Sequence, residues 1–126
     1  MKVKKVLVVE DESDTRWGIC HYLKKEGFLV FEAENGLRAK EILQKEKIDV
    51  ILSDLKMPKM DGAELLKYCK ESKIPATFIL MTAYGDCQSY CDIMSLGAYE
   101  YMNKPVLLEE IINLLKKIER EKNERN

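Results

Sequence analysis

The chain has no excess of charge of either sign, no long apolar run and a single histidine. Its 21 basic and 22 acidic residues leave a formal net charge of −1, so no overall field attracts nucleic acid or an anionic membrane. The longest apolar runs fall far short of the roughly 18 residues of a membrane-spanning helix. The basic start is followed by an apolar run only at residues 6–9, too short for a signal peptide. We therefore expect a cytoplasmic domain without direct contact to membrane or nucleic acid.

The residues for a thiolate metal site are also lacking. The chain has four cysteines: Cys20, Cys69, Cys87 and Cys91. Cys87 and Cys91 have the spacing of two ligands on one helix, but no second pair completes a zinc site. Together with Tyr90 and Met94 they follow the spacing of a core-facing stripe. Without a secretory signal, we interpret the cysteines as buried thiols rather than disulfides.

What is present is enough for one globular domain with its own core, since 46% of the 126 residues are apolar and 34% are charged. β-branched and apolar runs predict five strands, at 5–9, 28–33, 50–53, 77–81 and 99–102. Helical spacing predicts a helix after each, at 13–26, 36–46, 62–72, 86–96 and from about 107. Gly27 and Gly97 are placed to end the first and fourth helices. Asn35-Gly36 is a hairpin dipeptide, but the helical period after it favours a helix start.

Two of these helices carry apolar residues at helical spacing. The first has an apolar stripe of Trp17, Cys20 and Leu23, with Trp17 packed or partly exposed and His21 beside the stripe on the surface. The last helix has an apolar face of seven residues: Leu107, Leu108, Ile111, Ile112, Leu114, Leu115 and Ile118.

Alternation of strands and helices predicts an α/β fold with a five-stranded parallel sheet and helices on both faces. For this size the flavodoxin-like strand order 2-1-3-4-5 is the natural arrangement. Its switch point lies between the first and third strands, where such folds hold their ligands. Side chains at the carboxyl ends of the strands are therefore the candidates for function.

The stretch from Ile51 to Gly62 has an acid at such an end. The apolar strand stops at Asp54, and Pro58 prevents the chain from continuing as regular structure. Asp61 is placed as the N-cap of the next helix, with Glu64 completing a capping box. We expect strand, acid, irregular loop and helix, in that order.

Other strands end in polar residues that should converge on Asp54. Glu10 and Asp11 follow the first strand, Thr82 the fourth and Lys104 the fifth. Three carboxylates repel unless a cation joins them, and oxygen ligands suit Mg²⁺ or Mn²⁺. A lysine, a hydroxyl and backbone amides at strand ends suit a phosphate. The set indicates phosphoryl transfer, with Asp54 as the nucleophile.

At the same positions the chain resembles a response-regulator receiver domain from end to end. The matching segments are Glu10-Asp11, the run Asp54-Leu-Lys-Met-Pro-Lys-Met-Asp-Gly, Thr82-Ala83 and the run from Tyr101 to Pro105. The resemblance implies that Asp54 accepts a phosphoryl group from a phosphohistidine of a sensor histidine kinase. It implies no turnover of a separate substrate, so we do not expect an enzyme.

The resemblance also implies a role for each site residue. Asp11, Asp54 and the backbone carbonyl of Lys56 would bind Mg²⁺, and Glu10 would reach it through water. Lys104 would contact Asp54 or its phosphoryl group, and Thr82 would hydrogen-bond a phosphoryl oxygen. Thr82 and Tyr101 would form the switch. Backbone groups of two further residues would bind phosphoryl oxygens: Leu55 and Ala83.

Residues 81–86 and 96–101 are most similar to receivers of the NtrC class, which precede an ATPase module that activates sigma-54 transcription. On this interpretation residues 1–118 are the receiver, 119–126 begin a charged linker or helix extension, and an output domain is missing. A homodimer on activation is a further expectation. Tyr84 and Lys56 flank the site and are expected to tune dephosphorylation.

Three other interpretations remain open. The chain could be a stand-alone single-domain response regulator, whose last helix simply frays. It could be a Mg²⁺-dependent aspartyl-phosphate phosphatase, although Lys56 stands where such enzymes carry a second acid. It could also be a binding module without phosphorylation, which the retained site residues argue against. A nucleotide-binding domain is disfavoured because no glycine-rich phosphate loop follows a strand.

Overall fold

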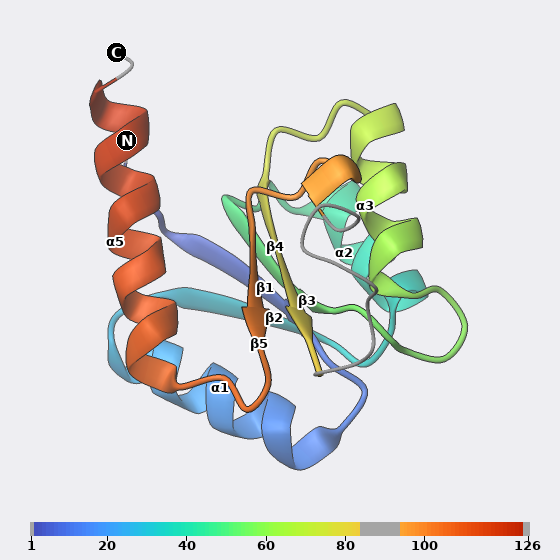
Figure 1. The fold of residues 1–126 in the computed structure, drawn as a ribbon, viewed down its shortest axis with the longest axis horizontal. Helices are drawn as coiled ribbons and strands as arrows, with labels where there is room; N and C mark the ends of the chain where they lie inside the picture. The colour runs from blue at the N-terminus through green and yellow to red at the C-terminus, as the bar shows by residue number, and fades with distance from the viewer. Residues whose placement is uncertain (1, 84–93, 125–126) are drawn as a thin grey trace.

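The computed structural model describes residues 2–83 and 94–124, and these form a three-layered α/β domain (Figure 1). The strands are β1 (Lys5–Val9), β2 (Leu29–Ala33), β3 (Val50–Asp54), β4 (Thr77–Thr82) and β5 (Glu100–Asn103). The helices are α1 (Ser13–Lys25), α2 (Gly36–Lys45), α3 (Gly62–Glu71) and α5 (Leu108–Glu124). The helix predicted over 86–96, with Cys87, Tyr90 and Cys91, lies almost entirely outside the described residues, as does Tyr84.

The five strands form one parallel sheet in the order β2-β1-β3-β4-β5, which confirms the predicted topology. β3 and β4 are buried along their whole length, as their near-continuous apolar sequences predict for central strands. β2 lies at an edge and has exposed positions. Val9 pairs with Ser53, so the next residues, Glu10 just after β1 and Asp54 at the end of β3, lie at the same level.

The sheet separates two apolar cores. α1 and α5 cover one face, where Val8, Leu52 and Ile111 are fully buried, and α2 and α3 cover the other, where Leu7, Ile51 and Leu65 are (Figure 1). No helix among residues 2–83 and 94–124 is both long and apolar enough to cross a membrane.

Local capping sets where the helices begin and end. Asn35 caps α2 through its side chain, and Asp61 with Glu64 forms the predicted capping box of α3. Gly27 and Gly97 have φ angles of 97° and 95°, which confirms the predicted helix-ending glycines. Strand ends differ from the prediction by one residue at Phe28, Asp54, Thr82 and Tyr99–Asn103, within the usual spread of such boundaries.

Two residues of the predicted apolar stripes are largely exposed. Trp17 is 64% exposed and stacks on His21, because α1 buries Ile19, Cys20 and Leu23 and leaves Trp17 at the margin of that stripe. Leu107 is 60% exposed, because it precedes α5 and its carbonyl accepts the first helical N–H groups.

Candidate functional site

Three acids predicted from the sequence meet at the carboxyl ends of β1 and β3. Glu10 is completely buried, Asp54 is nearly so and Asp11 is exposed. One carboxylate oxygen from each of the three lies within 4.8 Å of the others. The prediction that the sheet brings these side chains together is therefore correct.

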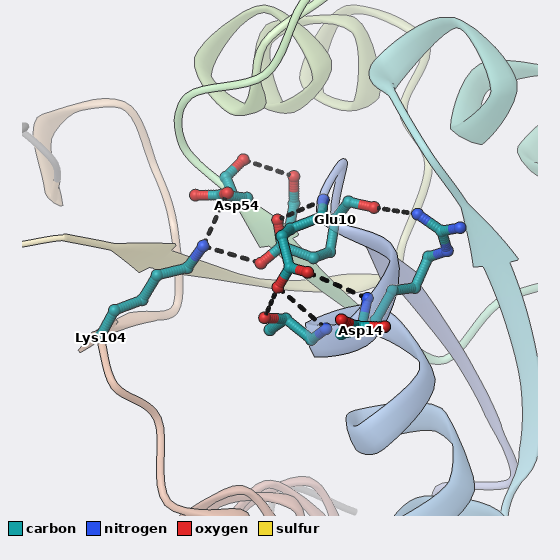
Figure 2. A network of polar contacts seen from close by, with 8 residues as sticks. Glu10, Asp14, Asp54 and Lys104 are labelled. Carbon is teal, nitrogen blue, oxygen red and sulfur yellow. Dashed lines mark hydrogen bonds and ion pairs between the residues drawn. The ribbon is translucent and has the colours of Figure 1, made fainter.

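Lys104 lies between two of these acids, as Figure 2 shows. Its Nζ atom is 2.8 Å from Oδ2 of Asp54 and 2.7 Å from Oε1 of Glu10. The backbone N–H of Lys104 donates to the carbonyl of Thr82 at 2.8 Å, which fixes the start of this loop against β4. The pairing with Glu10 has no counterpart in the sequence prediction, which gave Lys104 a contact with Asp54 or its phosphoryl group.

The charges of this cluster do not balance. Partial burial alone lowers the pKa of Lys104, but hydrogen bonds and charges of Asp54 and Glu10 outweigh it and raise this pKa above its ordinary value. Although the Asp11 residue is exposed, desolvation of its carboxylate by neighbouring groups raises its pKa, and the hydrogen bond and charge of Glu10 raise it further. One lysine faces three carboxylates, so an additional cation is electrostatically favoured here.

The donor set defines which cation fits. Glu10, Asp11 and Asp54 offer carboxylate oxygens, and hard divalent ions such as Mg²⁺ prefer oxygen ligands. The Asp11 side chain is exposed, which leaves room for the waters that Mg²⁺ keeps. This acidic pocket therefore fits the metal that the sequence predicts.

Glu10 is held by neighbours that sequence reasoning missed. Nη1 of Arg16 donates to the Glu10 carbonyl at 2.6 Å, and Nε of Arg16 is 3.5 Å from Glu32 on β2. The N–H of Glu12 donates to Oε2 of Glu10 at 3.3 Å, while the Glu12 carboxylate caps α1. No short motif signals Arg16, because its partners lie six residues back and on another strand.

Thr82 and Tyr101 lie on β4 and β5. The Thr82 side chain is fully buried, and its hydroxyl donates to the Ala83 carbonyl at 3.2 Å. Tyr101 is partly buried and packs against the core on the α2/α3 face of the sheet. The register pairs Asp54 with Met81, so Thr82 follows at the next level of the neighbouring strand.

The backbone N–H of Leu55 has a partner in the sheet. It donates to the Met81 carbonyl at 2.8 Å, continuing the hydrogen bonds between β3 and β4 one residue past the strand. The predicted contact of the Leu55 backbone with a phosphoryl oxygen stays a prediction, and it would require this N–H to leave or share the Met81 carbonyl.

Taken together, the geometry defines a doubly wound α/β domain with an acidic cation pocket at its switch point, completed by the lysine that follows β5. Comparison with known families gives the same result. The family model of the response regulator receiver domain matches residues 6–116. The chain belongs to this family.

Relatives of two kinds match the chain. It is 38% identical over 117 residues to sporulation initiation phosphotransferase F of Bacillus subtilis, covering 93% of this chain and 94% of that protein. It is 35% identical over 117 residues to the DNA-binding transcriptional regulator NtrC of Proteus hauseri, covering 93% of this chain. The chain spans only 25% of that NtrC protein.

Solved structures agree with the family assignment. A response regulator receiver domain protein from Clostridium thermocellum superposes with a TM-score of 0.86 at 31% identity. That alignment covers 95% of this chain and 98% of the other. The receiver fold is thus shared over nearly the whole length.

Proposed function

We propose that Asp54 accepts a phosphoryl group from a phosphohistidine of a sensor histidine kinase. The observation that carries the proposal is the placement of Asp54 at the end of β3, beside Glu10 and Asp11 and 2.8 Å from Lys104. A carboxylate oxygen of Asp54 attacks the phosphorus atom, the phosphorus–nitrogen bond breaks, and the imidazole leaves with that electron pair. The product is an aspartyl-phosphate.

Charge is the main obstacle to this step, because an anionic nucleophile meets an anionic phosphoryl group. The ammonium group of Lys104 lies within hydrogen-bond distance of Asp54 and balances charge on the incoming oxygens. Asp11, Asp54 and the Lys56 carbonyl would hold Mg²⁺ or Mn²⁺, with Glu10 through water. When bound, the ion supplies further neutralisation of the phosphoryl oxygens.

The switch rests on Thr82 and Tyr101. The Thr82 hydroxyl donates to the Ala83 carbonyl, and a phosphoryl oxygen on Asp54 offers a more strongly charged acceptor. Rotation of this hydroxyl toward the phosphoryl group frees space that Tyr101 fills, which alters the surface made by β5 and α5. A homodimer formed through that surface belongs to the same proposal.

The kinase approaches beside Lys104. A groove of about 500 Å³ lies there, lined by Asp14, Thr15 and Ile19 of α1 and by Pro105 and Val106 before α5. Its mixed apolar and polar lining suits the helix that carries the phosphohistidine, since an amphipathic helix lays its apolar face into such a groove. Docking there places the imidazole next to the acidic pocket.

The output of the domain has two candidate forms. Similarity to NtrC over a quarter of its length favours the N-terminal domain of a sigma-54-dependent transcriptional regulator. Similarity to sporulation initiation phosphotransferase F over 94% of that protein favours a single-domain regulator. In both, the domain catalyses only its own phosphorylation and dephosphorylation. A phosphatase acting on other substrates is disfavoured by Lys56.

The test is the intact mass of the protein after incubation with acetyl phosphate and Mg²⁺, beside Asp54→Asn and an EDTA control. The proposal expects one added phosphoryl group that requires both Asp54 and the metal. Gel filtration of the same sample then tests dimerisation. No mass gain with any phosphodonor and divalent ion would overturn the proposal and leave an unphosphorylated binding module.

A further inference from the structure

The loop that follows Asp54 of the acidic pocket is attached to a helix that contributes no side chain to the pocket. Gly36, the first residue of α2, is buried, and its N–H donates to the carbonyl of Met60 at 3.0 Å. Met60 lies near the end of the loop between β3 and α3. α2 is thereby joined to a loop that starts directly after Asp54.

The close approach of Met60 leaves no room for a side chain at Gly36. A Cβ atom on Gly36 would lie 2.4 Å from the Met60 carbonyl oxygen and 2.6 Å from Met60 Cγ, closer than real Cβ contacts. The φ angle of Gly36 is not in the left-handed region, so other residues could adopt its backbone conformation. Only close approach of the two backbones demands glycine here.

The other end of the loop is held in the same manner. The N–H of Gly62 donates to the Leu55 carbonyl at 2.8 Å, and a Cβ there would lie 2.4 Å from the Asp54 carbonyl oxygen. Gly62 thus packs against the phosphoacceptor itself, and Gly36 packs against the far end of the loop. Between these two contacts lies Lys56, whose carbonyl we assign to the metal.

If Gly36 gained a side chain, the loop would move rather than the helix. α2 is anchored in the core by Ala39, which is fully buried, and by Ile42, which is 7% exposed. Lys56, Pro58 and Lys59 of the loop are exposed. Leu55, Met57 and Met60 pack against the core but are only partly buried. A loop without a fully buried side chain is the softer element.

We propose that Gly36 is a positioning residue that sets the loop, and with it the Lys56 carbonyl, for divalent metal binding. This inference rests on the proposed function. The structure of the loop makes the effect specific, because Asp54, Asp11 and Lys104 do not depend on Gly36 for their positions. A change at Gly36 should therefore weaken metal binding more than it slows the transfer step at saturating metal.

The test compares Gly36→Ala with the wild-type chain in two assays. The Mg²⁺ dependence of phosphorylation by acetyl phosphate is measured by intact mass, and Mn²⁺ binding is measured by electron paramagnetic resonance without any phosphodonor. We expect metal affinity to fall about tenfold in both, as when groups that orient metal ligands are altered. The phosphorylation rate of Gly36→Ala at saturating Mg²⁺ should stay within about twofold of the wild-type rate. A variant that only binds the metal more weakly behaves like the wild type once the metal is bound.

Ile42→Val is the matched control. It removes one buried methyl group from the same helix without adding volume beside Met60, and it should leave both metal affinities unchanged. Equal affinity in Gly36→Ala and wild type would overturn the proposal, and so would an equal loss in Ile42→Val.

A measurement on the wild-type chain covers the case in which Gly36→Ala does not fold. The amide resonance of Gly36 should shift during a Mg²⁺ titration, although α2 holds no metal ligand, while the amide of Lys45 at the other end of α2 should not. A silent Gly36 resonance would refute the inference. Failure of the wild-type chain to require Mg²⁺ for phosphorylation would instead refute the proposed function.

Discussion

The ammonium group of Lys104 lies 2.8 Å from the carboxylate of Asp54, although 50 positions separate the two residues in the chain. Two strand ends supply the pair, and β4 lies between them in the sheet. The same ammonium group contacts Glu10, which is completely buried. Lys104 is therefore a candidate ligand of the phosphoryl group. It is also the cation that compensates the charge of the buried Glu10 carboxylate.

The first prediction concerns this second role. Lys104→Met in EDTA should lower the free energy of unfolding by about 1–3 kcal/mol, the cost of leaving a buried polar group without its partner. Urea denaturation measures the change. Lys116→Met, which alters an exposed lysine on α5, should cost far less, and equal losses in the two variants would contradict the assignment.

Asp11 is expected to limit stability when metal is absent. Desolvation of the carboxylate and the neighbouring Glu10 disfavour its charged form. Asp11→Asn in EDTA should therefore raise the free energy of unfolding, but by less than about 1 kcal/mol, because Asp11 is exposed and its charge is screened by solvent. In Mg²⁺ the wild type should instead be more stable than Asp11→Asn. A metal at a hundredfold excess over its Kd stabilises the wild type by about 2.7 kcal/mol, and the variant should lose most of this gain. Thermal melts with and without Mg²⁺ measure both effects.

Asp14→Asn is the control for this prediction, because Asp14 is an exposed acid three residues further on. It should keep the full Mg²⁺ stabilisation. Retention of that stabilisation by Asp11→Asn as well would remove Asp11 from the metal site.

The buried cysteines should resist alkylation. Burial raises the pKa of the Cys20 thiol to about 12 and that of Cys69 to about 11, from an ordinary value of 9.0. Only the thiolate reacts, so labelling of both at about pH 8 should require unfolding. Peptide mapping after iodoacetamide treatment, with and without urea, distinguishes the two states, and rapid labelling of the native protein would be contrary evidence.

The same shifts give a pH dependence of stability. Because the folded pKa values are raised, the neutral thiols contribute full stability below pH 9.0, the ordinary value. As pH rises further, the unfolded thiols ionise while the folded ones do not, so stability falls until the folded pKa values are passed.

Lys73→Gly should stabilise the chain. Lys73 follows α3 with a φ of 56°, a region that glycine adopts without steric cost. We expect a gain of about 0.5–1 kcal/mol, the left-handed penalty less the entropy of glycine. Lys67→Gly, at an exposed position inside α3, should instead lose about 1 kcal/mol. Chemical denaturation measures the free energy of unfolding of both variants. A lower value for both than for the wild type would show that position 73 carries no strain.

The predicted domain boundary after Ile118 can be tested by truncation. Beyond it, Glu119 accepts a hydrogen bond from the N–H of Val3, and Glu121 accepts one from the Tyr99 hydroxyl. A chain ending at residue 118 should lose about 1–3 kcal/mol, roughly one for each hydrogen bond and the rest for helix packing. A chain ending at residue 124 is the control. Equal stability of all three chains would place the domain end where the sequence predicts it.

Much of the fold follows from local patterns. β-branched runs mark β1, β3 and β4 because central parallel strands are apolar on both faces. Asp61 and Glu64 identify the start of α3 because a capping box satisfies its first N–H groups. The convergence of Glu10, Asp11 and Asp54 follows from the strand order, since parallel strands end at one edge of the sheet.

Other features could not be predicted from the sequence, because contacts with neighbouring helices and strands determine them. Trp17 and Cys20 are three residues apart and so about 60° apart around a helix, and only the seat of α1 on the sheet decides which of them is covered. The N–H of Leu55 donates to the Met81 carbonyl and so extends the hydrogen bonds to β4 past the end of the strand. Periodicity and motif position contain no information on either contact.

The order of the amino acids alone thus determines which residues end the strands, and so which chemistry is available: three carboxylates, a hydroxyl and a lysine. Packing decides how they are used. Lys104 also neutralises Glu10, Arg16 holds the Glu10 carbonyl, and Gly36 admits the backbone of Met60. These pairs join distant parts of the chain through distances of a few ångströms. Such distances depend on how helices and strands pack against one another. No local sequence pattern encodes that packing.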